Sequence, residues 1–146
     1  MRIAQKLGLA AMVLFAISQF LPAYGSGRGF ACFQVCWETL VKPDTHDLGA
    51  WLYYSGFVIS SILFLVLVVA LFMTEKIRQP RGLGSFILFL HVMSWSFLHV
   101  IDGNRSGFYE IKVGYYVWLL AYALLFVAHV VKEPNRLGQQ TKSVTV

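Results

Sequence analysis

Residues 48–74 read LGAWLYYSGFVISSILFLVLVVALFMT and contain no Asp, Glu, Lys or Arg. Three further stretches, residues 7–27, 82–101 and 113–131, are equally free of charged residues. A helix needs about 20 apolar residues to cross the roughly 30 Å hydrocarbon core of a bilayer, and each of the four stretches is long enough. The sequence therefore predicts an all-α integral membrane protein, a four-helix bundle in which neighbouring helices run antiparallel.

The composition leads to the same class of protein. Apolar residues make up 58% of the chain and charged residues 13%, about half the charged fraction of a soluble domain. A chain of 16.5 kDa cannot bury that much apolar surface inside itself, because small domains leave a large share of their surface exposed. We expect one transmembrane domain, residues 1–134, with spans near 5–24, 49–73, 84–102 and 113–131 and an outer loop at 22–48. A polar cytoplasmic tail follows at 135–146.

The basic residues are distributed unevenly between the two predicted faces of the membrane. Of the 12 Lys and Arg residues, eight fall on the side that holds both termini, and four fall on the other side. The eight are Arg2, Lys6, Lys76, Arg78, Arg81, Lys132, Arg136 and Lys142. Because short loops rich in Lys and Arg stay in the cytoplasm, we expect a multi-pass protein of a bacterial inner membrane with both termini cytoplasmic. The net charge of +5 follows from this orientation, so nucleic acid is not an expected partner.

The connections between the spans differ in character. The first span resembles a signal peptide, which is an open alternative, but we favour a retained signal-anchor helix. The long outer loop includes residues 30–40, which suit a short helix that lies on the membrane or caps the bundle. On the inner side, residues 74–84 contain Pro80, Gly82 and Gly84 and are predicted to form a turn.

Both cysteines, Cys32 and Cys36, fall in the outer loop, on the periplasmic or extracellular side. In an oxidising compartment nearby thiols tend to pair, so a disulfide is the expected state, although so small a loop adds little stability. Free thiols packed against lipid are the alternative. Redox catalysis is less favoured, since thiol oxidoreductases typically use C-x-x-C.

Histidines and aromatic residues give the last two spans a polar face each. The third span carries His91, Trp95 and His99 on one side of the helix, and the fourth carries Tyr122 and His129. Ionisable side chains within a membrane usually face the interior of a bundle. At about 1.5 Å of rise per residue, His91 and Tyr122 lie at the same depth, about 14 Å from the outer ends. We therefore expect a hydrogen bond between them.

We expect no cofactor, but two alternatives remain, haem b and a transition metal. Histidines on facing helices can ligate haem b, but His91 and His129 differ in depth by about 9 Å. A transition metal is the second alternative, because His46, His99 and Asp102 all fall at the outer boundary, and imidazole with carboxylate suits zinc or copper.

The sequence contains no phosphate-binding glycine loop, no G-x-S-x-G and no H-E-x-x-H, so an enzyme is not the expectation. The predicted function is that of a non-enzymatic accessory subunit, assembly factor or inhibitor, which binds another membrane protein or further copies of itself. Two alternatives remain open. One is a redox or cofactor-binding membrane protein that uses the histidines or the cysteine pair, and the other is a small transporter or channel subunit.

Overall fold

The computed structural model of the chain describes residues 2–42, 48–73, 78–101 and 111–131. These residues form five helices and one two-stranded hairpin, which confirms the predicted all-α class. The elements are α1 (Ile3–Phe20), β1 (Pro22–Tyr24), β2 (Gly27–Arg28), α2 (Gly29–Val41), α3 (Leu48–Ala70), α4 (Arg78–Ile101) and α6 (Val113–Val130). Each of the four charge-free stretches contains most of one long helix, and the end of the first stretch forms most of the hairpin.

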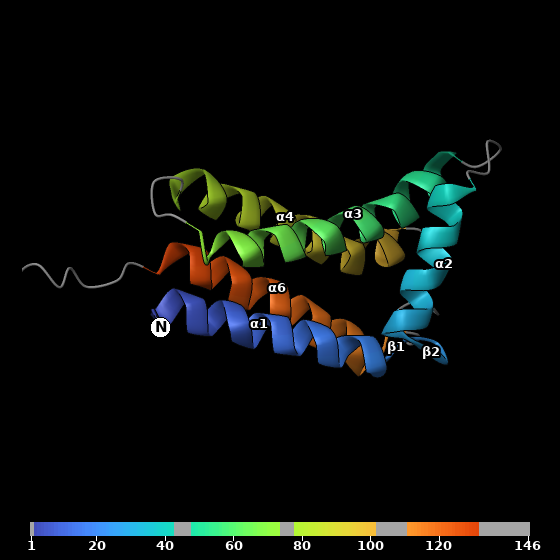
Figure 1. The fold of residues 1–146 in the computed structure, drawn as a ribbon. Coiled ribbons are helices and arrows are strands. Elements are labelled where there is room, and N and C mark those ends of the chain that lie inside the picture. Colours follow the sequence, from blue (N-terminus) through green and yellow to red (C-terminus); the bar gives the residue numbers. More distant parts are fainter. Residues whose placement is uncertain (1, 43–47, 74–77, 102–110, 132–146) are drawn as a thin grey trace, which may run out of the picture.

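The four long helices lie alongside one another as a bundle (Figure 1). α1 packs most extensively against α6, and α6 packs next most extensively against α4. Both of these pairs run antiparallel, so the start of α1 and the end of α6 lie at the same end of the bundle (Figure 1). α2 crosses the opposite end at a steep angle to the other helices (Figure 1). We call this opposite end the capped end.

The predicted outer loop is largely regular structure, because residues 22–41 fold into the hairpin and α2. We call these residues the cap. Gly25 has a φ of 54°, the left-handed region that glycine adopts without steric cost, and it lets the chain reverse between β1 and β2. The hairpin also pairs with the residues before α6, through a bridge between Tyr24 and Ile111 and a 3.0 Å bond from the Lys112 N–H to the Ala23 carbonyl. The cap therefore joins the first long helix to the last.

The prediction of a turn over residues 74–84 is wrong in its second half, because α4 already begins at Arg78. Pro80 lies in the first turn of this helix, where the missing N–H has no intrahelical acceptor to lose. Gly82 and Gly84 follow inside the same helix.

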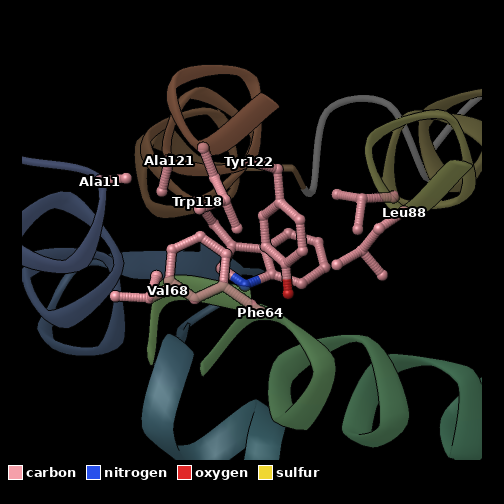
Figure 2. Packing of buried hydrophobic residues seen from close by; sticks show 9 residues of the cluster. Ala11, Phe64, Val68, Leu88, Trp118, Ala121 and Tyr122 are labelled. Atoms are coloured by element: carbon pink, nitrogen blue, oxygen red, sulfur yellow. The ribbon is translucent and has the colours of Figure 1, made fainter. Parts of the chain in front are cut away.

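Aromatic rings from three helices fill the centre of the bundle. Phe15 of α1 stacks on Phe64 of α3, with ring centroids 4.6 Å apart and an interplanar angle of 15°. Tyr122 of α6 packs against Phe64 at 4.8 Å and against Trp118 at 4.9 Å. Figure 2 shows the rings of Phe64, Trp118 and Tyr122 meeting, with Leu88 of α4 beside them. The core is therefore apolar and contains residues from α1, α3, α4 and α6.

Two of the described helices, α1 and α6, are long and apolar enough to cross a membrane, as judged by length and composition. The corresponding apolar segments of α3 and α4 are shorter, at Tyr54–Ala70 and Gly82–Ser94.

Candidate functional site

A cavity of about 360 Å³ lies at the capped end, between the cap and the helices beneath it. All the described parts of the fold except α4 contribute to its walls. Ser18 and Gln19 come from the end of α1, and Cys32 and Cys36 come from α2. The large side chains that line it are Tyr24, Tyr54, Phe57, Ile111, Tyr115 and Trp118.

Two glycines hold the walls of this cavity close together. A Cβ on Gly29 would lie 2.5 Å from the Ser18 carbonyl oxygen, and one on Gly114 would lie 2.6 Å from the Pro22 carbonyl oxygen. Both neighbours are backbone atoms, which cannot rotate away. The Gly29 N–H also donates to the Leu21 carbonyl at 3.0 Å. Glycine at these two positions therefore lets α2 and α6 approach the end of α1.

The aromatic side chains form a connected wall. Phe57 of α3 stacks on Trp118 of α6 at 4.8 Å, with an interplanar angle of 24°. The ring centroid of Tyr115, one turn earlier in α6, lies 5.9 Å from that of Trp118. The Tyr115 hydroxyl donates to the Val92 carbonyl of α4 at 3.1 Å. These contacts fix the rings in place, so one wall of the cavity is preformed and aromatic.

The predicted disulfide is absent, because Cys32 and Cys36 are free thiols. They lie one turn apart in α2, and Cβ atoms four residues apart on a helix are separated by about 5–6 Å. A disulfide requires a Cβ separation of about 3.5–4.5 Å. The helical conformation of this segment therefore disfavours the bond, and both thiols line the cavity instead.

Burial keeps both thiols protonated at neutral pH. It raises the pKa of the Cys32 thiol, partly offset by backbone hydrogen bonds. Burial, together with repulsion from Cys32, raises the pKa of Cys36 to about 12. Because the thiolate is the nucleophile and the metal ligand, these two thiols are poor candidates for either role.

The expected hydrogen bond between His91 and Tyr122 is not formed. The Tyr122 hydroxyl is buried without a hydrogen-bond partner among the described residues, and the side chain of His91 is exposed. Tyr122 instead points among the rings of α1 and α3. The periodicity of the third span placed His91 on a helical face, but that face does not point to Tyr122.

His129 is buried near the end of α6. Its Nδ1 lies 2.9 Å from the Leu125 carbonyl oxygen, and because a carbonyl only accepts, Nδ1 carries the proton and donates. His91 and His129 are therefore in different surroundings, one exposed and one buried.

The remaining predicted site residues are not placed by the structure. His46 and Asp102 lie outside the described residues, and so do the side chains of Trp95 and His99. Among the side chains that are described, no cluster of three or more His, Cys, Asp or Glu residues could hold a metal ion. The prediction of a metal site from His46, His99 and Asp102 stays untested.

No known protein family matches the chain, and neither a curated protein nor a solved structure is similar to it. Function is therefore argued from the geometry. The residues that sequence reasoning missed are those of the cavity wall, chiefly Gly29, Phe57, Gly114 and Trp118. The glycines at the starts of α2 and α6 were the available signal, since glycine at a helix end can mark a close backbone approach.

Proposed function

We propose that the chain is a multi-pass inner-membrane protein with four spans, α1, α3, α4 and α6. The observation that carries this proposal is the distribution of polar and apolar side chains. Large aliphatic residues are exposed on all four helices, for example Val13, Val66, Ile87 and Leu120, while serines are buried between them. Soluble monomers rarely expose apolar patches of that extent, whereas lipid solvates them without cost.

Four of the buried serines, Ser18, Ser60, Ser61 and Ser85, donate within their own helices, whereas the Ser55 hydroxyl has no partner among the described residues. Ser60 and Ser61 donate to the Gly56 and Phe57 carbonyls at 2.6 and 3.0 Å, and Ser85 donates to the Gly82 carbonyl at 3.0 Å. In a membrane such bonds let a small polar residue sit at a helix contact. They also give little support to the transporter or channel alternative, which requires a continuous path of accessible polar groups.

The charge distribution supports an orientation with both chain ends in the cytoplasm. The start of α1 and the end of α6 lie at one end of the bundle (Figure 1), which agrees with the cytoplasmic position predicted from Lys and Arg. In this orientation the cap lies on the periplasmic side. α1 is then a retained span, which is supported by its fully buried Ala11 and by the contact of Gly8 with Leu71.

Within this orientation, the protein acts as a non-enzymatic accessory subunit of another membrane protein, and the outer face of α2 is its binding surface. Phe30, Trp37 and Val41 are 63%, 47% and 59% exposed. Their spacing of seven and eleven residues places them on one side of the helix. Because α2 crosses the end of the bundle, this stripe lies outside the bundle core and is available to a neighbouring chain.

Photo-crosslinking in native membranes tests the proposal. Benzoylphenylalanine replaces Trp37 in one variant and Val66, an exposed residue in the middle of α3, in the control. We expect one discrete protein adduct from the Trp37 position and mainly lipid adducts from Val66. The same partner should co-purify stoichiometrically with the wild type and be lost on Trp37→Ser. An adduct of twice the chain mass would assign the surface to self-association, and the absence of any protein adduct would overturn the proposal.

A second candidate function, cofactor or redox chemistry, is less favoured, because burial keeps the two thiols of the cavity protonated. A visible spectrum and metal analysis of the purified protein test it. A Soret band or stoichiometric metal would replace the accessory role with this second function.

A further inference from the structure

The cavity at the capped end has the size of a ligand site. Its volume of about 360 Å³ is more than twice the roughly 150 Å³ of an engineered cavity that binds benzene. It also falls within the range of about 300–1,000 Å³ that is typical of small-molecule pockets. A compound of about two rings would fill it.

The polar groups of the wall are few, and the indole N–H of Trp118 has no hydrogen-bond partner among the described residues. The Ser18 hydroxyl donates to the Phe15 carbonyl at 2.6 Å, and the Gln19 amide reaches the same carbonyl at 3.4 Å. None of the described residues that line the cavity carries a charged side chain, and burial keeps the thiols neutral. A charged guest would therefore lose its hydration without compensation.

The shape of the wall favours rings over flexible chains. Tyr24, Tyr54, Phe57, Tyr115 and Trp118 all face the cavity, and the Phe57–Trp118 stack presents fixed aromatic surface. Aromatic rings gain from stacked or edge-to-face contact beyond their burial. Thiols add polarisable surface, which also favours contact with rings.

We propose that the cavity between the cap and the ends of α1, α3 and α6 is a binding site for an uncharged aromatic compound of about two rings. The backbone contacts at Gly29 and Gly114 fix the separation of the walls, so the site is already formed without the ligand. Binding therefore needs little rearrangement of the cap. This site is separate from the outer stripe of α2, so the inference does not depend on the accessory role.

Benzophenone is a suitable probe, since it is uncharged, has two rings and inserts into nearby C–H bonds under ultraviolet light. The full-length protein in mild detergent is irradiated with benzophenone, and the labelled peptides are mapped by mass spectrometry. We expect labelling to concentrate on residues of the wall, such as Val35 and Phe57, and to saturate with concentration. 4-Benzoylbenzoate, which has the same rings and one negative charge, should not label these residues.

A pair of matched variants separates the cavity from the detergent-facing surface. Ala31 and Gln34 are both exposed residues of α2, but only Ala31 lines the cavity. Ala31→Trp should fill part of the site and weaken the saturable labelling by about tenfold or more, which is a loss of about 1.4 kcal/mol in binding. Gln34→Trp should label like the wild type.

Several outcomes would overturn the proposal. Labelling that is spread over lipid-facing residues such as Val66, without enrichment at the wall, would remove the site. Equal labelling of Ala31→Trp and Gln34→Trp would do the same. If methyl palmitate displaces benzophenone while uncharged aromatic competitors such as naphthalene do not, the cavity takes acyl chains and the aromatic class is wrong.

Discussion

Replacing Gly29 with alanine tests the contact that closes the cap onto the bundle. The new Cβ would lie 2.5 Å from the Ser18 carbonyl oxygen and 2.9 Å from the Gln19 Cα. Ordinary van der Waals contact begins at 3.4 Å, so α2 and the end of α1 must separate by about 0.9 Å. This movement also stretches the 3.0 Å bond from the Gly29 N–H to the Leu21 carbonyl.

The expected cost follows from these two effects. Overpacking of a close contact destabilises by about 1–3 kcal/mol, and a weakened hydrogen bond adds about 1 kcal/mol. Gly29→Ala should therefore lower the free energy of unfolding by about 2–4 kcal/mol. Gly114→Ala should behave alike, because its Cβ would lie 2.6 Å from the Pro22 carbonyl oxygen.

Gly84 supplies the matched control. It lies inside α4, and a Cβ there would meet nothing within 4 Å. Alanine at an open helical position stabilises by about 0.5–1 kcal/mol, so Gly84→Ala should be neutral or better. Equilibrium unfolding in mixed detergent and SDS micelles gives all three free energies. If Gly29→Ala and Gly84→Ala unfold alike, the close approach of α2 and α1 is refuted.

Four further predictions concern single side chains. With Cys36 at a pKa of about 12, burial disfavours the thiolate, so its alkylation by N-ethylmaleimide should keep rising about tenfold per unit from pH 8 to 10. A plateau near pH 9, as for an ordinary thiol, would contradict this. Tyr122→Phe should be neutral or stabilising in the unfolding assay, because it removes a buried hydroxyl without a partner, whereas Phe64→Ala should cost about 3–5 kcal/mol. Tyr115→Phe should cost about 1 kcal/mol by losing its bond to the Val92 carbonyl, and an unchanged free energy would show that this bond contributes nothing.

The long helices were predictable because their signal is local. Each charge-free stretch contains enough apolar residues for a helix within one window of sequence, and the structure has a helix at each. The cap was predictable only in part, because α2 matches the short helix expected over residues 30–40. The attachment of its hairpin to the start of α6 depends on pairing Ala23 and Tyr24 with Ile111 and Lys112, and no local pattern marks partners so far apart in the chain.

Helical periodicity predicts only part of the candidate site. Spacing identifies residues that share a helical face, but it does not say where that face points, so His91 was expected inside and is exposed. For Cys32 and Cys36 the spacing itself contained the answer. Two cysteines four residues apart in a helix are too far apart for a relaxed disulfide, and the sequence predicts a helix over residues 30–40.

The pairing of α1 with α6 has a consequence for biosynthesis. α1 packs mainly against a helix that is translated some 90 residues later, from Val113 onward. Synthesis runs from the N-terminus, so α1 leaves the ribosome long before its main neighbour exists. Until α6 is made, the side of α1 that packs against it lacks this neighbour. Strand β1 can pair with the residues before α6 and close the cap only after α6 has been made, so the bundle and the cavity are completed together.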